Sequence, residues 1–425
     1  MKYKHAPLTL ALTLLLALAP HFAHSDDAPL DLQRAKAIDA RKKAGETVSA
    51  EDEAYLKWAR EEFQKRQQAA NGKPADGKAA GANKDGAAST TPVSDPKIVA
   101  TLVPLDELKD AYKGEDGGLY GGGRNTPPEP LAAAYREESK KIQPLNAEGK
   151  PSADGKIVLL SLGMSNTTME FSEFVKTANA DTKKAANVVV VDGAIGARTG
   201  LAWALDGAEL LPAPEQERLQ TNWEKMGRQG KGPGDTWSTA EKRLQDNGVT
   251  PQQVQVMWIK QAEARPASQG EFPAHARTLE TDIIDILNIA KHRYPNLRIV
   301  YLSSRIFAGY ATSNLNPEPY AYEEAFSMRW IIQEQGKGEP RLNYDPKHGA
   351  VQAPLVVWGP YLWANGKTPR KSDGLVWNED DFVTTDHTHP SNSARAKVAG
   401  LLLNFYHTNE VASRWYLKPG ETAAK

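Results

Sequence analysis

Five short apolar runs constrain the fold of this chain more than any other feature of its sequence. They are rich in β-branched residues and lie at 156–163 (KIVLLSLG), 187–192 (NVVVVD), 254–259 (VQVMWI), 297–303 (LRIVYLS) and 355–358 (LVVW). Such runs are typical of strands buried on both faces of a parallel sheet. Helical patterns lie between them, so the sequence predicts a three-layer α/β/α domain with a parallel sheet of about five strands.

Two of the helical patterns are clear. Apolar residues at helical spacing between Leu279 and Tyr294 predict a helix that stops before Pro295, and Val398 to Phe405 predict a last helix. The core of the domain is therefore expected at 156–410. In open α/β sheets ligands bind at the carboxyl ends of the strands, so functional residues are expected where the strands end.

The N-terminus has the pattern of a secretory signal peptide. Lys2 and Lys4 precede an apolar run at 8–19, and small residues follow at 23–25. The sequence thus predicts that 1–25 direct export to the periplasm or beyond the cell. No later run reaches the roughly 18 apolar residues of a membrane helix, so we expect no membrane insertion.

Composition divides the rest of the chain. Residues 26–70 predict a short charged helical hairpin in which Ser49 and Asp52 form a capping box, and 71–96 predict a flexible linker. The main globular domain would then occupy 97–425, with a glycine-rich N-terminal segment at 97–155.

Charge and cysteine content exclude several classes of function. The formal net charge is −1, without the basic excess of a nucleic-acid binder. The chain has no cysteine, which excludes disulfides, thiolate metal sites and a cysteine nucleophile.

A candidate nucleophile follows the first strand. Ser165 stands on the turn Gly163-Met164-Ser165-Asn166, where a side chain leaving a buried strand becomes exposed. A serine hydroxyl attacks a carbonyl only when a base removes its proton, so a histidine must lie within hydrogen-bond reach. A serine at this place can also be simply a helix N-cap.

The candidate base lies just before the last helix. Of the nine histidines, those outside the segment 385–391 (TDHTHPS) fall in the leader, on or near helices, or in a loop rich in Pro and Gly. Asp386 stands three residues before His389, a spacing that lets a carboxylate orient an imidazole. The alternative is a solvated loop in which Ser391 caps the helix.

Taken together, G-x-S-N after the first strand and D-x-x-H-P-S before the last helix resemble the SGNH (GDSL-type) hydrolase superfamily. The nearest branch comprises carbohydrate esterases and sialate O-acetylesterase-like proteins, whose middle motif W-x-x-G-E resembles 258–263 (WIKQAE). The resemblance covers about 156–406. It implies a flavodoxin-like sheet and an esterase that acts through Ser165, His389 and Asp386 without a cofactor.

The same resemblance implies an oxyanion hole and a substrate site. The oxyanion donors would be the backbone N–H groups of Ser165 and Gly193 and the side-chain amide of Gln261, with Gly196 as an alternative to Gly193. Candidate substrate contacts are Asn166 and Glu263. Apart from the resemblance, the glycine-rich stretch 117–125 is either a flexible loop or a loop that wraps the rim of the site, with Arg124 or Asn125 touching the substrate. The expected substrate is a small molecule or carbohydrate carrying acyl esters, O-acetyl above all.

Two other hypotheses remain at this point. Asp386, His387 and His389 could instead bind a metal ion for hydrolysis. The domain could also be a silent glycan-binding protein, because Met164 and Ala262 depart from the family pattern.

Overall fold

The computed structural model describes residues 35, 38–39, 41–42, 47–59, 91–230 and 232–421. Two compact units make up the chain, 1–82 and 83–425. The predicted signal peptide and residues 71–90 of the predicted linker lie outside the described residues.

The first unit contains a small helical cluster. Ile38 packs against Tyr55, Leu56 and Ala59, all of them buried. The Ser49 hydroxyl accepts a hydrogen bond from the Asp52 N–H (3.1 Å), so Ser49 caps the helix that follows, as the sequence predicts. An ion pair between Lys42 and Glu53 (2.7 Å) ties the two helical stretches together.

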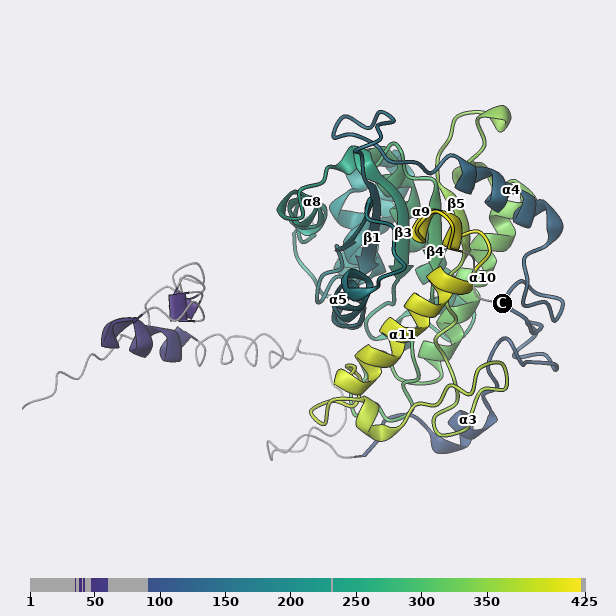
Figure 1. The fold of residues 1–425 in the computed structure, drawn as a ribbon. Helices are drawn as coiled ribbons and strands as arrows, with labels where there is room; N and C mark the ends of the chain where they lie inside the picture. Colours follow the sequence, from purple (N-terminus) through teal and green to yellow (C-terminus); the bar gives the residue numbers. More distant parts are fainter. Residues whose placement is uncertain are drawn as a thin grey trace, which may run out of the picture. The chain divides into compact units, whose positions relative to one another are not determined.

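The second unit is built on a parallel five-stranded sheet, with strand order β2-β1-β3-β4-β5 (Figure 1). Each predicted run forms one strand: β1 Ile157–Gly163, β2 Val188–Asp192, β3 Val254–Lys260, β4 Ile299–Leu302 and β5 Leu355–Trp358. Burial along these strands is almost complete, which explains why their sequences carry apolar side chains on both faces. The predicted three-layer α/β/α fold is confirmed.

Helices cover both faces of the sheet. Their bounds are α3 Pro96–Thr101, α4 Glu129–Lys140, α5 Ser165–Ala180, α6 Gly200–Asp206, α7 Ala213–Lys225, α8 Thr236–Asp246, α9 Ala274–Arg293, α10 Tyr320–Lys337, α11 Asn392–Thr408 and α12 Ser413–Tyr416. α5 packs against α11, while α9 packs against α6 and α10. The predicted helices before Pro295 and at the end of the core are α9 and α11.

Strand order reverses direction at β1. The chain passes from β1 to β2 on one side and then returns to β3 on the other. At such a switch point the loops after neighbouring strands separate and leave a crevice, which is where open α/β sheets bind ligands. Ser165 follows β1 directly, so the candidate nucleophile lies at this point.

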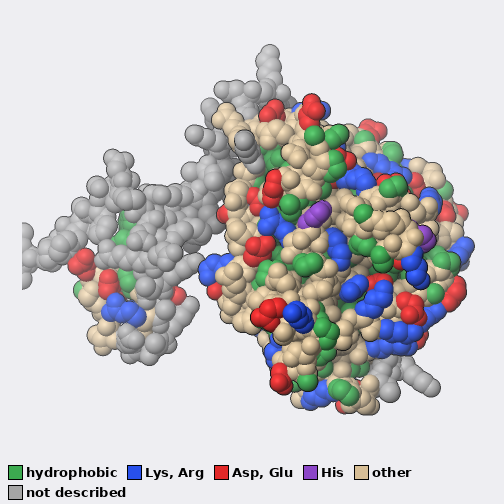
Figure 2. Space-filling model, turned by 90° about the horizontal axis from the view of Figure 1, so that it is seen from above, with side chains coloured by type: hydrophobic (Ala, Val, Ile, Leu, Met, Phe, Trp, Pro, Cys, Tyr) green, Lys and Arg blue, Asp and Glu red, His purple; other side chains and the backbone are tan. Residues whose placement is uncertain are grey.

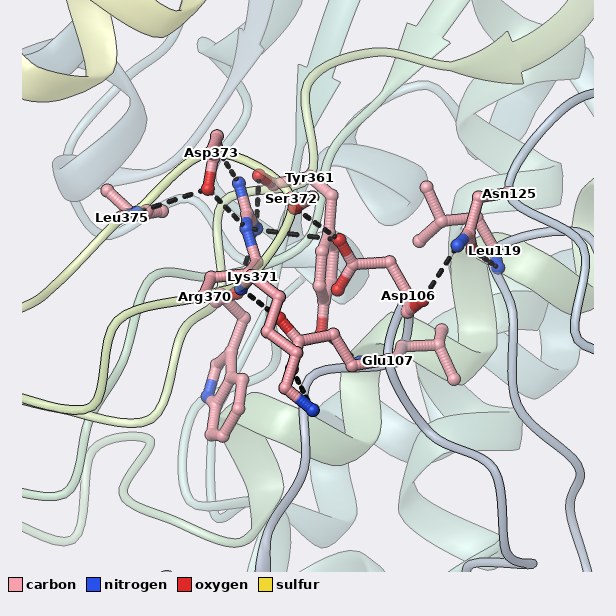
Figure 3. A network of polar contacts seen from close by, with 12 residues as sticks. Asp106, Glu107, Leu119, Asn125, Tyr361, Arg370, Lys371, Ser372, Asp373 and Leu375 are labelled. Carbon is pink, nitrogen blue, oxygen red and sulfur yellow. Dashed lines mark hydrogen bonds and ion pairs between the residues drawn. The ribbon is translucent and has the colours of Figure 1, made fainter.

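The glycine-rich N-terminal segment, residues 97–155, contacts the end of β5, which is an edge strand of the sheet. Arg370 contacts the carboxylates of Asp106 and Asp373, and Asn125 bonds to Leu119 and Asp106 (Figure 3). The Leu119 carbonyl accepts a hydrogen bond from the Trp358 indole at the end of β5 (2.6 Å). This hydrogen bond therefore joins the segment to the end of β5.

Basic and acidic side chains are interspersed on the face of the molecule shown in Figure 2. Among the described residues, no helix is both long enough and apolar enough to cross a membrane.

Candidate active site

The turn after β1 presents Ser165 as the first residue of α5. A side chain at Gly163 would come within 2.4 Å of the Lys260 carbonyl oxygen and of the Thr167 hydroxyl, so only glycine fits where β1 passes β3. The Ser165 hydroxyl is partly exposed and lies 2.9 Å from Nε2 of His389. This distance is short enough for direct proton transfer between the two groups.

His389 is held on its other side by Asp386. Nδ1 of His389 lies 2.5 Å from Oδ2 of Asp386, and Oδ1 accepts the N–H groups of Thr388 (2.9 Å) and His389 (3.0 Å). Burial raises the pKa of Asp386, but the hydrogen bonds from the His389 side chain and backbone and the Thr388 N–H outweigh it and lower the pKa below its usual value. The carboxylate is thus ionised and can orient the imidazole.

Hydrogen bonds hold the loop that carries His389 to two neighbouring segments. The Asn166 amide donates to the Thr388 carbonyl (3.0 Å), and the Thr312 N–H donates to the Asp386 carbonyl (3.0 Å). Asn166 is 1% exposed, so this amide is committed to joining the serine turn to the histidine loop. The structure therefore corrects its predicted role as a substrate contact.

The oxyanion side differs from the prediction. The N–H of Gly193 donates to the Ser161 hydroxyl (3.2 Å), which leaves it unavailable to a substrate in this structure. A β-carbon built on Gly196 would lie 4.0 Å from the β-carbon of Ser165, so Gly196 is the glycine that faces the nucleophile. In the described part of the chain, the Gly196 N–H meets no acceptor. The geometry favours the alternative glycine.

Gln261 follows β3 and is completely buried. Its amide donates a long hydrogen bond to the Arg198 carbonyl (3.4 Å), and its carbonyl oxygen accepts from the Ala262 N–H (3.3 Å). The side chain thus lies between the end of β3 and the loop that contains Gly196. Its bonds are weak enough to be exchanged, but they hold it to the backbone in this structure.

The Glu263 side chain holds the start of α6. Its carboxyl accepts the Leu201 N–H at the start of α6 (2.8 Å), and the side chain is 1% exposed. Burial and the nearby carboxyls of Asp282 and Glu324 raise the pKa of Glu263 well above its usual value. Because this side chain is buried and bonded to the start of α6, the structure does not support the predicted substrate contact at Glu263.

Arg124 and Asn125 lie away from the serine. Both groups of the Asn125 amide are used within the N-terminal segment, which contacts the end of β5. β3 and β4 separate β5 from β1 in the sheet. The structure does not bring these two residues to the candidate site.

Backbone strain is concentrated on the loops around the serine. Four non-glycine residues in the described part of the chain have a positive φ, and three of them are Ala197 (61°), Arg265 (56°) and His387 (47°). They lie on the loops after β2, after β3 and before α11. Residues held in this region of φ are disfavoured by steric contacts and occur often at functional sites.

The proposed metal ligands do not assemble. Nowhere in the described ranges do three His, Asp or Glu side chains form a group that could hold a metal ion. Nδ1 of His387 lies 3.9 Å from Glu379, at the exposed side of the loop.

Sequence reasoning missed a pair of buried charges beneath the serine. Lys260, the last residue of β3, forms an ion pair with Glu170 of α5, and both side chains are 0% exposed. The signal was present, because a lysine ends an otherwise apolar strand (VQVMWIK). Its partner could not be identified without the fold.

Comparison of this chain with protein-family models gives no match, and comparison with curated proteins gives none either.

Proposed function

We propose that this chain is an exported serine esterase of the SGNH (GDSL) type that hydrolyses acyl esters, above all O-acetyl groups on carbohydrate. The observation that carries the proposal is the hydrogen-bonded series from Ser165 to His389 (2.9 Å) and from His389 to Asp386 (2.5 Å). The leader at 1–25 supports export, and the family resemblance supports the substrate class.

The chemistry follows from these contacts. Nε2 of His389 takes the proton of Ser165 as its oxygen attacks the ester carbonyl, and the Asp386 carboxylate stabilises the imidazolium that forms. The N–H of Ser165 is suited to hold the oxyanion, because the first N–H groups of a helix have no intrahelical acceptor. The N–H of Gly196 is a second donor, because this glycine of the loop after β2 faces Ser165. His389 then protonates the leaving alcohol. Water, activated in the same way, cleaves the acyl-serine and restores the enzyme.

The partial exposure of the histidine and aspartate fits a large substrate. The side chains of His389 and Asp386 are 22% and 26% exposed. Cavities of about 740 and 920 Å³ lie elsewhere on the domain and do not include Ser165. His389 and Asp386 can therefore be reached from the surface, which suits an ester carried on a polymer.

The test is covalent labelling of the mature protein with a fluorophosphonate, followed by mapping of the labelled residue. We expect labelling at Ser165 and hydrolysis of an aryl acetate, with both lost in Ser165→Ala and in His389→Ala. Ser172→Ala is the matched control, since Ser172 lies on the same helix and its hydroxyl bonds to Asp192 (2.7 Å).

A second candidate is a silent glycan-binding protein, favoured by the engaged Gly193 N–H. An unlabelled Ser165 in correctly folded protein, together with binding of glycans, would replace the esterase by this function.

A further inference from the structure

The loop after β2, residues 192–196, has to keep one conformation if Gly196 is to face Ser165. Glycines at 193 and 196 leave the backbone of this loop free to take several conformations, because glycine is the least restricted residue. Side-chain contacts therefore have to fix the course of the loop. Arg243 of α8 and Asp192 at the end of β2 supply such contacts.

Arg243 lies in the last turn of α8 and bonds to the backbone of the loop. Its Nη1 donates to the carbonyl of Asp192 (3.0 Å) and to that of Ala194 (2.6 Å). The same nitrogen lies 3.8 Å from the Asp192 carboxylate, which balances its charge. Hydrogen bonds from a charged donor are about twice as strong as those between neutral groups, so this one side chain holds two carbonyls firmly.

The positions of these two carbonyls decide where the N–H groups that follow them point. In a trans peptide unit the C=O and the N–H lie on opposite sides, so the N–H groups of Gly193 and Ile195 point away from Arg243. Both bond to β1, Gly193 to the Ser161 hydroxyl (3.2 Å) and Ile195 to the Gly163 carbonyl (3.0 Å). Arg243 and β1 therefore hold the loop from opposite sides, up to the residue before the glycine that faces the serine.

The carboxylate of Asp192 holds the start of the loop. Its Oδ1 accepts the Ser161 hydroxyl (2.7 Å) and the Ala194 N–H (3.1 Å). Its Oδ2 accepts the hydroxyls of Thr168 (2.5 Å) and Ser172 (2.7 Å) of α5. One carboxylate thus joins the loop to β1 and to α5, and the loss of either α5 hydroxyl leaves the other in place.

We propose that Arg243 and Asp192 are positioning residues that hold Gly196 where its N–H can donate to the oxyanion formed at Ser165. They act through the backbone of the loop rather than on the substrate. The inference rests on the proposed esterase function. An oxyanion donor stabilises the tetrahedral intermediate more than the bound ester, so a loosened loop should lower kcat and leave KM nearly unchanged.

The first test measures kcat and KM for an aryl acetate in Arg243→Met, which keeps a long side chain but removes the donors. We expect kcat to fall about 10- to 100-fold, with KM within about twofold of the wild type. Arg243→Lys should recover part of kcat, because a single nitrogen makes both bonds in the wild type. Lys242→Met is the matched control and should leave kcat unchanged, since Lys242 lies beside Arg243 on α8 and pairs with exposed Asp246.

The second test uses a boronic acid as an analogue of the tetrahedral intermediate. Its boron forms a bond to the Ser165 oxygen while the hydroxyl proton passes to His389, which leaves a negatively charged boronate beside the oxyanion donors. The inhibition constant should rise in Arg243→Met by about the factor by which kcat falls. An unchanged inhibition constant would overturn the positioning role, because a loss of folded protein alone does not weaken inhibition of the molecules that remain active.

The third test does not depend on turnover. Amide hydrogen exchange, measured by NMR, should be about tenfold faster at Gly193 and Ile195 in Arg243→Met, while Leu160 in β1 keeps its rate. Unchanged exchange at both amides, or a kcat within twofold of the wild type, would overturn the positioning role. Faster exchange at these amides in a protein that hydrolyses no ester would instead retain Arg243 as the anchor of the loop and reject the esterase.

Discussion

Two groups of charged side chains meet at the carboxyl ends of β1 and β3, and they differ in their access to water. The serine corner consists of Ser165, His389 and Asp386, which are partly exposed and joined by hydrogen bonds in this order from Ser165 through His389 to Asp386. Directly beneath it is a buried charged cluster, defined here as Glu170, Lys260, Arg305, Glu318 and Glu324, all at most 3% exposed. Arg305 of the cluster lies 3.8 Å from the sulfur of Met164, the residue before Ser165.

The two groups differ in whether hydrogen bonds or burial decide their pKa values. In the corner, hydrogen bonds outweigh burial and keep Asp386 ionised. In the cluster, burial lowers the pKa of Lys260 to about 8 and raises those of Glu318 and Glu324 to about 7 and 8. Two guanidinium nitrogens of Arg305 have no partner among the described residues. In this domain a strongly shifted pKa therefore indicates that a side chain is deeply buried. The candidate catalytic groups are instead those that have hydrogen-bond partners and are accessible to a substrate.

The largest effect is expected at Asp386. Asp386→Asn keeps the shape of the side chain but removes the charge that orients His389, so kcat for an aryl acetate should fall about 10⁴-fold while stability changes little. Steady-state kinetics and thermal unfolding measure the two quantities. Asp380→Asn, on the same loop but exposed, is the control. A loss of less than tenfold in Asp386→Asn would mean that this carboxylate does not orient the base.

The next largest effect is expected on stability, and it distinguishes the buried charged cluster from the corner that contains Ser165. Lys260→Met leaves Glu170 buried without its partner, so the free energy of unfolding in urea should fall by about 3–5 kcal/mol. Changing Lys260 and Glu170 together to Met should recover most of that loss, because no buried charge remains unpaired. Equal destabilisation of the single and double variants would show that packing, rather than charge, holds this part of the domain.

The smallest effect is on the pH dependence of stability. Glu324 has its pKa raised from 4.5 to about 8, so the folded state binds its proton more tightly than the unfolded state does. The stability this contributes is complete below about pH 4.5 and is lost as the pH rises through about 8. Glu324→Gln should flatten the decline of the melting temperature between about pH 4.5 and about pH 8. The exposed Glu148→Gln should follow the wild type, and parallel curves for Glu324→Gln would contradict a raised pKa.

Much of the fold was predictable because its signals are local. Each apolar run became a strand, and the periodic stretch before Pro295 became α9. The three-residue spacing of Asp386 and His389 likewise predicted a contact that the structure forms. Helix α10 was missed, since nearly every residue on it from Ala321 to Ile332 is buried and no polar face marks its period.

The sequence by itself determined the strands, the order of the layers, and which serine, histidine and aspartate stand where strands or helices begin and end. Only the tertiary structure decided which glycine faces Ser165, and that Asn166 joins two loops while Glu263 holds the start of α6. The physical reason is the distance along the sequence between the residues that interact. Strand and helix patterns depend on neighbours within a few residues, whereas a hydrogen bond such as Asn166 to Thr388 joins residues 222 positions apart and exists only after the sheet has formed.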